Sequence, residues 1–264
     1  MLSPLSPWLR FARRLKDLVI TLLVWAYFTA GFVVFFSLFY LFAFLFSKER
    51  TAAFQAMNSR FFRSFFRLCQ FLIPRHQWQI DPEIRSIRSS VVLCNHVSYL
   101  DSIFLISLFP KHTTIAKARL FDVPVFGQLV KLSGYIPSSS EGPYAALFLD
   151  ILDTLAGHLA GGGNIVVFPE GRRSRNGQVG PLHKGIFKIA RHCKAPISIL
   201  GIRNTDRLFE PGKFLFDTCS ENTIHLKQIA QLHPDYASRD FSIKGLMTHV
   251  GGLLAQHAAT GETP

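Results

Sequence analysis

Between Leu18 and Phe46 the chain runs for 29 residues without a charged side chain. As one helix this stretch would be about 44 Å long, against an apolar bilayer core of about 30 Å. A single span would need a strong tilt, whereas a break at Gly31 would give two short helices that enter the membrane and return. Because basic residues flank both ends, the positive-inside rule favours the returning hairpin.

The positive charge of the chain is concentrated at the same end. Lys and Arg number 29 against 17 Asp and Glu, and ten of these bases but only two of the acids precede residue 76. A chain that is 48% hydrophobic and only 17% charged is too apolar for a disordered protein and atypical of a nucleic-acid-binding one. We therefore expect residues 1–47 to be a membrane anchor at the cytoplasmic face of the inner membrane, in contact with membrane lipids and not with nucleic acid.

Residues 48–75 have the pattern of a basic amphipathic helix. Arg60, Arg63 and Arg67 recur at helical spacing on one face. The other face is largely apolar and contains Phe54, Phe61, Phe65, Leu68 and Leu72. Such a helix can lie in a membrane interface, or it can pack its apolar face on a globular domain. The two arrangements are compatible.

Residues 76–264 alternate short apolar runs with longer mixed segments, which is typical of a catalytic domain of the α/β class. We expect a layered, mostly parallel or mixed sheet flanked by helices. Strands are predicted at 90–94, 113–116, 164–168, 196–201 and 223–229, and helices at 101–108, 142–159, 183–193 and 242–256. Functional sites in such folds gather at the carboxyl ends of strands.

A polar segment, Asn95 to Asp101, follows the first predicted strand. Ser98 and Asp101 have the spacing of a capping box for the next helix, which would leave His96 as a loop residue. If His96 instead lies in the turn before that helix, Asp101 can accept a hydrogen bond from one ring nitrogen and leave the other as a base. The residues alone leave both interpretations open.

A second polar segment, Phe168 to Arg175, follows the strand at 164–168 and contains a glycine and three arginines. Guanidinium groups pair with phosphate oxygens, and glycine lets the backbone approach them, so the segment indicates a phosphate site. The alternative is an exposed basic loop. Lys184, near the start of the next predicted helix, is placed to add another contact with an anion.

The cysteine and histidine spacings do not indicate a metal site. The four cysteines, Cys69, Cys94, Cys193 and Cys219, form no Cys-x-x-Cys pair and no disulfide framework. We expect a reducing cytosolic setting, no metal and no resident cofactor.

Together, these segments resemble the glycerolipid acyltransferases, the family typified by 1-acyl-glycerol-3-phosphate acyltransferase. Asn95, His96 and Asp101 match the Asn-His-x4-Asp motif of this family. Residues 168–174 match its Phe-Pro-Glu-Gly-x-Arg-Ser block, with Arg172 where Thr is commonest. Weaker matches extend the resemblance over about residues 93–201, at Lys117, Pro124, Phe126, Gly127, Lys184, Gly185 and 195–197.

The resemblance implies the glycerol-3-phosphate acyltransferase fold and transfer of a fatty acyl group from acyl-CoA or acyl carrier protein to the free hydroxyl of a lysophospholipid. It implies that His96 is the general base and Asp101 its partner, with no protein nucleophile. The residues implied in substrate binding are Asn95, Ser98, Lys117, Glu170, Gly171, Arg172, Arg173, Ser174 and Lys184.

One block departs from the family. Where the family commonly has Gly-x-x-Phe-x-x-Arg, this chain has Ser140 in place of the arginine that binds the acceptor. The favoured acceptor is 1-acyl-sn-glycerol-3-phosphate, with phosphatidic acid as the product. The alternative is another lysophospholipid or a lyso-amino-acid lipid. Arg172, Arg175 and Lys131 are candidates for the missing charge.

Two other functions compete with this one. Ser98 is a candidate nucleophile in a triad with His96 and Asp101, but it lacks a Gly-x-Ser-x-Gly elbow. The chain is also a candidate non-catalytic adaptor whose basic front binds anionic lipid. An adaptor has no need for the ordered set of His96, Asp101, Glu170 and Arg173.

Overall fold

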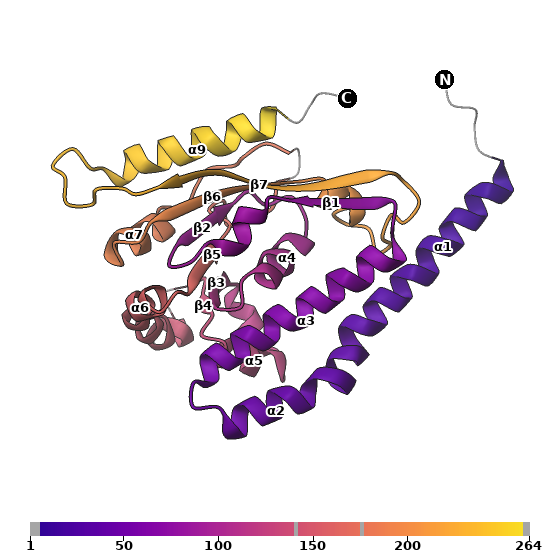
Figure 1. The fold of residues 1–264 in the computed structure, drawn as a ribbon, viewed down its shortest axis with the longest axis horizontal. Helices are drawn as coiled ribbons and strands as arrows, with labels where there is room; N and C mark the ends of the chain where they lie inside the picture. The colour runs from indigo at the N-terminus through magenta and orange to yellow at the C-terminus, as the bar shows by residue number, and fades with distance from the viewer. Residues whose placement is uncertain (1–5, 140–141, 175–176, 261–264) are drawn as a thin grey trace.

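A seven-stranded sheet forms the centre of the computed structural model, which describes residues 6–139, 142–174 and 177–260 (Figure 1). Its strand order is β1-β7-β6-β2-β5-β3-β4. The strands are β1 (His76–Ile80), β2 (Val91–Cys94), β3 (His112–Ala116), β4 (Ile136–Pro137), β5 (Asn164–Val167), β6 (Ile197–Arg203) and β7 (Asn222–Leu232). All neighbours pair in parallel except β6 and β7, which are antiparallel. The predicted α/β fold with a mixed sheet is confirmed.

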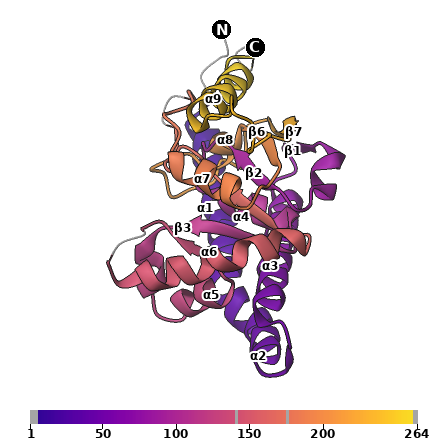
Figure 2. The ribbon, with the colours of Figure 1, turned by 90° about the vertical axis from the view of Figure 1, so that its left-hand side faces the viewer.

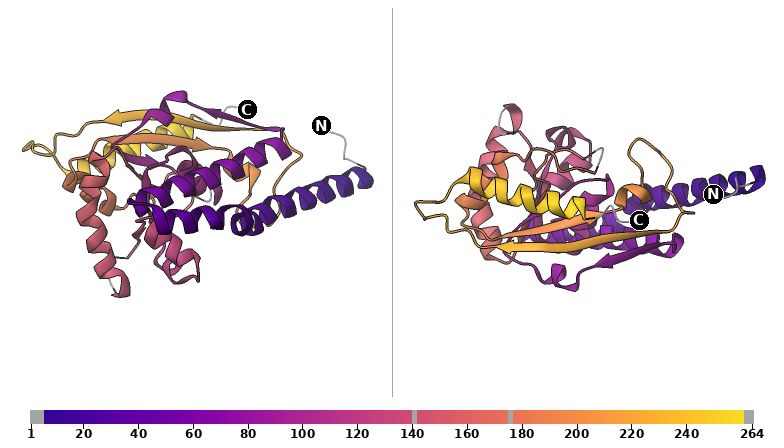
Figure 3. Two further views of the ribbon diagram at one scale, coloured as in Figure 1. Left: turned by 60° about the horizontal axis from the view of Figure 1, so that its bottom comes forward. Right: turned by 90° about the horizontal axis from the view of Figure 1, so that it is seen from above.

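Helices cover both faces of the sheet (Figures 1 and 3). The helices of the domain are α4 (Leu100–Leu108), α5 (Phe126–Leu132), α6 (Ala145–Ala160), α7 (Lys184–His192), α8 (Thr205–Leu208) and α9 (Ile243–Ala259). Side chains of β2 alternate between two cores, since Val92 packs with α3 (Arg50–Leu72) and α4 whereas Val91 packs with α6, α7 and α9. A strand buried on both faces reads as an unbroken apolar run, which is why β2 was predictable.

Every strand and helix predicted for residues 76–264 is present, with ends that differ by three residues or fewer. The prediction omitted β1, β4, α5 and α8. β1 lies at one edge of the sheet and alternates exposed polar with buried residues, and β4 at the other edge has only two residues. Edge strands lack the apolar runs that mark the centre of a parallel sheet.

The N-terminal helix is continuous from Pro7 to Phe46, so the predicted reversal at Gly31 is wrong. Gly31 lies in a π-helical segment, Tyr27–Phe36, that joins α1 (Pro7–Ala26) to α2 (Ser37–Phe46). Near each end of this π-helical segment, a side-chain hydroxyl donates to a backbone carbonyl four residues earlier. Thr29 bonds Trp25 at 2.8 Å, and Ser37 bonds Val33 at 2.5 Å. The chain reverses only after α2, where α3 (Arg50–Leu72) returns beside it (Figures 1 and 3).

This 40-residue helix is a candidate membrane span by length and composition. Only 22% of its most apolar window is buried, and Val33, Leu38, Phe42 and Phe46 are each at least 63% exposed. The exposed apolar surface is much larger than the scattered apolar residues of an ordinary soluble surface. It supports contact of this helix with a membrane, and a single span stays a prediction.

The first part of the same helix is held on the domain. The Asp17 carboxylate accepts hydrogen bonds from the backbone N–H (3.0 Å) and the hydroxyl (2.6 Å) of Thr218. The Thr21 hydroxyl accepts one from the N–H of Phe216 at 2.9 Å. Ile20 and Val24 are buried beside them in the same core as α3 and α4. The division into 1–47, 48–75 and 76–264 stays a prediction. In the structure, parts of the first two segments pack in the same core as the third.

The apolar face of α3 packs on the domain, as one of the two alternatives for this helix requires. Phe54, Phe61 and Phe65 are buried, while Arg60 and Arg67 are exposed. Arg63 bonds the carbonyl of Ser107 in α4 through Nε and Nη2, at 3.2 and 3.1 Å. Contact of α3 with a membrane interface stays a prediction.

Candidate active site

His96 and Asp101 meet at the carboxyl end of β2. Nδ1 of His96 lies 2.9 Å from Oδ2 of Asp101, with His96 in the turn before α4 and Asp101 in its first turn. Because an ionised carboxylate can only accept, Nδ1 carries the proton and Nε2 is left with a free lone pair. The side chain of Asp101 is fully buried, whereas that of His96 is 14% exposed and lines a cavity.

Asp101 also orders the turn before α4, and its bond to His96 is the one that the second interpretation requires. The first interpretation is wrong about the cap, because α4 follows Tyr99, whose side chain forms no capping hydrogen bond. Asp101 accepts hydrogen bonds at Oδ2 from the backbone N–H groups of Val97 and Ser98, both at 2.7 Å. Its Oδ1 accepts one from the hydroxyl of Thr205 at 2.5 Å. These donors offset the cost of burying a carboxylate and fix its position against the imidazole.

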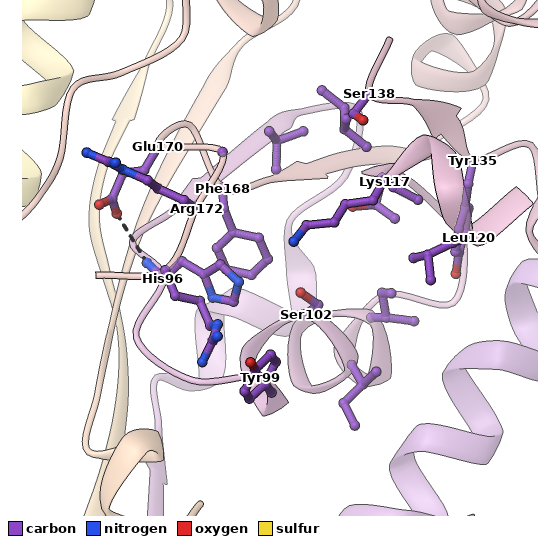
Figure 4. Close-up of a pocket in the computed structure, with 18 of the residues that line it drawn as sticks. His96, Tyr99, Ser102, Lys117, Leu120, Tyr135, Ser138, Phe168, Glu170 and Arg172 are labelled. Atoms are coloured by element: carbon purple, nitrogen blue, oxygen red, sulfur yellow. Dashed lines mark hydrogen bonds between the residues drawn. The ribbon is translucent and has the colours of Figure 1, made fainter. Parts of the chain in front are cut away.

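The second polar segment holds the first in place. The ring of Phe168 stacks on the imidazole of His96, with centroids 4.1 Å apart (Figure 4). Glu170 accepts hydrogen bonds from the backbone N–H groups of His96 (3.3 Å) and Gly180 (2.8 Å), and the N–H of Ser174 donates to the carbonyl of His96 at 2.7 Å. Burial raises the pKa of the Glu170 carboxyl, and the two backbone donors oppose that shift.

Gly171 makes the turn of this segment possible. Its φ is +63°, and a Cβ built there would lie 2.8 Å from the imidazole of His183. The N–H of His183 donates to the carbonyl of Pro169 at 2.7 Å, which holds the backbone of residue 183 beside this turn. A side chain at position 171 would be strained by conformation and by contact.

Cationic side chains surround the dyad. The guanidinium carbon of Arg173 lies 3.2 Å from the ring centroid of Tyr99, and its Nη1 is buried without a hydrogen-bond partner in the described part of the chain. Arg172 is exposed at the turn, and Lys117 extends across the cavity toward Phe168 and His96 (Figure 4). A stacked arginine with an unpaired buried N–H is suited to an anionic group.

Seven of the residues predicted to bind substrate line this cavity: Lys117, Glu170, Gly171, Arg172, Arg173, Ser174 and Lys184. Of the candidates for the charge that Ser140 lacks, Lys131 stacks over Tyr144 at 5.9 Å and does not line the cavity. Ser140 and Arg175 lie outside the described residues. Arg172 is therefore the one of these candidates that the structure places at the dyad.

The structure does not bring Asn95 and Ser98 to the cavity. The Asn95 amide forms two hydrogen bonds with the backbone of Ile202, at 2.8 and 2.9 Å, and ties the end of β2 to β6. The fully buried Ser98 hydroxyl donates to the carbonyl of Phe209 and accepts from the N–H of Leu100. Both side chains hold the segment that carries the dyad through bonds on the side away from the cavity. Because Ser98 is buried there, it is not a candidate nucleophile.

The cavity has a volume of about 2450 Å³, and the residues that line it come from three regions around His96. One part, between the N-terminal helices, α4 and α5, is apolar and includes Phe28, Phe32, Phe61, Phe62, Ile106, Leu129 and Val130. Its lining also includes a buried polar group in which Tyr40 donates to Asn58 and Asn58 to Tyr135. A second part is the arginine turn, and the third lies between α6 and α7.

Sequence reasoning missed Thr205 and Tyr99. Thr205 lies 104 residues from Asp101 in the chain and reaches it only through the β6–α8 connection. Nothing in a single sequence marks that pairing. Tyr99 occupies a variable position of the Asn-His-x4-Asp motif, and its stacking under Arg173 depends on the second segment folding over the first.

Comparisons with known proteins find similarity over the central part of the chain. Residues 74–203 match the family model described as Acyltransferase. The chain is 31% identical over 122 residues to the chloroplastic 1-acyl-sn-glycerol-3-phosphate acyltransferase BAT2 of Brassica napus, covering 46% of this chain and 35% of that protein. It is 34% identical over 109 residues to a 1-acyl-sn-glycerol-3-phosphate acyltransferase of Cocos nucifera, covering 41% and 35%. The chain thus spans about a third of the length of these curated relatives.

The fold also matches a solved structure. The 1-acyl-sn-glycerophosphate (LPA) acyltransferase PlsC of Thermotoga maritima superimposes with a TM-score of 0.71 at 21% identity, over 96% of this chain and 98% of that one. The likeness therefore includes the N-terminal helices as well as the sheet. Residues 74–203 thus match the acyltransferase family model, and this segment contains the His96–Asp101 pair and the predicted substrate-binding residues that line the cavity beside it.

Proposed function

We propose that this protein is a membrane-associated O-acyltransferase that makes phosphatidic acid for phospholipid biosynthesis. It transfers a fatty acyl group from the thioester of coenzyme A or acyl carrier protein to the free hydroxyl of 1-acyl-sn-glycerol-3-phosphate. The observation that carries the proposal is the His96–Asp101 pair, 2.9 Å apart, where the apolar and cationic parts of one cavity meet. The activity named for the relatives from Brassica napus and Cocos nucifera supports this choice of acceptor.

The geometry supplies general-base catalysis. Nε2 of His96 takes the proton of the acceptor hydroxyl as its oxygen attacks the thioester carbonyl carbon. A C–O bond forms, the C–S bond breaks, and the thiolate takes the proton back from His96. Asp101 holds the imidazole in the required tautomer and stabilises its protonated form. The step needs no acyl-enzyme intermediate.

The cavity has a cationic part and an apolar part, which match the phosphate and the fatty acyl chains of the substrates. Arg172, Arg173 and Lys117 are suited to the acceptor phosphate, since they lie beside the dyad. The apolar part between the N-terminal helices and α4 is suited to a fatty acyl chain. Since Pro7–Phe46 exposes apolar side chains next to this part, acyl chains have a short path from a bilayer.

A His96→Ala variant tests the chemistry. In purified membranes, with a radiolabelled acyl thioester as donor, we expect acyl transfer to fall by about 10²- to 10⁴-fold while membrane binding is retained. His233→Ala removes an exposed histidine far along the chain and is the control. Full activity of His96→Ala would contradict the mechanism.

An acceptor panel tests the substrate. We expect 1-acyl-sn-glycerol-3-phosphate to be acylated faster than lysophosphatidylcholine, lysophosphatidylethanolamine or a lyso-amino-acid lipid, with acyl-CoA and acyl carrier protein each offered as donor. Preference for a lipid without a terminal phosphate would leave the proposed acyltransferase activity standing, but it would contradict 1-acyl-sn-glycerol-3-phosphate as the acceptor.

A further inference from the structure

The third part of the cavity is a groove between α6 and α7. α6 and α7 lie near each other on the same side of the molecule (Figure 2), and residues of both line the cavity that also contains His96 and Gly171. The lining of the groove includes Phe148, Leu149, Leu152 and Asp153 from α6, and Lys184, Gly185, Ile186, Lys188, Ile189 and His192 from α7. The α6 wall is thus mainly apolar and the α7 wall carries the basic side chains, a combination that neither the acyl chain nor the acceptor phosphate uses.

The basic wall is regular. Lys184, Lys188 and His192 are four residues apart, so they share one face of α7 and extend about 12 Å along its axis. The opposite face carries Ile186, Phe187 and Ala190, which are buried in the core. All three basic side chains are exposed, and none has a hydrogen-bond or ion-pair partner among the residues described.

One part of the acyl donor, the arm that carries the thiol, has not yet been assigned to a part of the cavity. The thioester carbonyl at His96 carries the acyl chain on one side and the thiol arm on the other, and the acceptor approaches from a third. In coenzyme A and in acyl carrier protein this arm is the same 4′-phosphopantetheine, with its thiol at one end, a dimethyl-substituted chain with two amides, and a phosphate at the far end.

We infer that the α6–α7 groove binds the 4′-phosphopantetheine arm of the acyl donor, with its phosphate against Lys188 and His192. The inference rests on the proposed function, because it extends the same site to the donor. The apolar wall suits the dimethyl-substituted chain, and the basic wall suits the phosphate. One carboxylate, that of Asp153 in α6, also lines the groove, which is why the phosphate is assigned to the α7 wall.

The double variant Lys188→Ala/His192→Ala tests this assignment, with Lys244→Ala as the control that removes an exposed lysine of α9 outside the cavity. We expect KM for acyl-CoA to rise about five- to tenfold and KM for the acceptor to stay within about twofold. The same increase is expected with acyl carrier protein as donor. An unchanged donor KM would overturn the inference, and so would an effect confined to acyl-CoA, which would place its nucleotide in the groove instead.

Direct binding separates this inference from the proposed function. By calorimetry, 4′-phosphopantetheine should bind the wild-type protein more tightly than pantetheine, which lacks the phosphate, and the double variant should lose that difference. Equal binding of the two compounds to the wild type would exclude the phosphate site. If the wild type binds 4′-phosphopantetheine but transfers no acyl group, the proposed function fails and the groove assignment stands.

Discussion

The connections that follow β2 and β5 both end at the same cavity, but they are built differently. The β2–α4 connection is short, and the side chains of Asn95, Ser98 and Asp101 are all paired within the protein. The β5–α7 connection, residues 168–183, is longer and leaves Arg172 exposed and Arg173 Nη1 unpaired among the described residues. The first connection fixes a geometry, and the second presents charge.

This difference follows from what each connection does in the proposed reaction. Proton transfer depends steeply on the distance and angle between the base and the hydroxyl, so the residues that hold His96 must be immobile. Recognition of a phosphate depends more on charge and on donors that are still free to bond. Changes in the first connection should therefore act on kcat, and changes in the second on KM for the acceptor.

The largest effect is expected from Asp101→Asn. An amide cannot accept from the imidazole and two backbone N–H groups as a carboxylate does, so we expect kcat to fall by about 10²- to 10⁴-fold in the acyl-transfer assay. Thr205→Val, which removes one donor to Asp101, should give a smaller loss in kcat. Asp240→Asn, an exposed change, is the control. A kcat within twofold of the wild type in Asp101→Asn would break the comparison.

An intermediate effect is expected from Arg173→Lys. Lysine keeps the charge but lacks the planar group that stacks on Tyr99 and forms paired hydrogen bonds with a phosphate. We expect KM for the acceptor to rise about tenfold and kcat to change less than about threefold. Arg191→Lys is a matched control, since Arg191 stacks on Phe241 outside the cavity. A loss confined to kcat would mean that Arg173 helps to fix the geometry of His96 and does not bind the acceptor phosphate.

The smallest effect concerns Glu170, which ties the two connections together. Burial raises its pKa above the ordinary value of 4.5, so the folded state takes up a proton at a higher pH than the unfolded chain does. The stability that this group contributes is complete below pH 4.5 and is lost as the pH rises through the folded pKa. In urea unfolding, the wild type should lose stability relative to Glu170→Gln over that window. If the difference in unfolding free energy between the wild type and Glu170→Gln stays constant with pH, the pKa of Glu170 is not raised in the folded state.

The sequence predicted the centre of the fold well and its edges poorly. Val91 to Cys94 are fully buried, so β2 reads as an apolar run that no loop would carry. β1 has the sequence His-Gln-Trp-Gln-Ile and pairs only with β7 among the described strands, so nothing in its composition requires a strand. The hairpin at Gly31 was wrong because one glycine costs a helix only about 1 kcal/mol, and the chain stays helical through it as a π-helical segment.

The candidate site was predictable only where its residues are close in the chain. His96 and Asp101 are five positions apart, and their meeting follows from one turn and the start of one helix. Asn95 and Ser98 belong to the same motif, yet their side chains turn away from the cavity to bond Ile202 and Phe209. A motif records which residues a site needs, but only the packing of distant segments decides which of them face the substrate.

The attachment of α1 to residues 216–218 has a consequence for how the protein approaches its lipid. Asp17 and Thr21 bond that segment, and Trp25 packs against Phe209 and Phe216. In the membrane-associated arrangement proposed above, these contacts couple the position of the apolar helix to that of the dyad. The depth and tilt at which the helix settles in the bilayer then set the height of His96 relative to the headgroups, because α1 is hydrogen-bonded to the domain that carries the dyad.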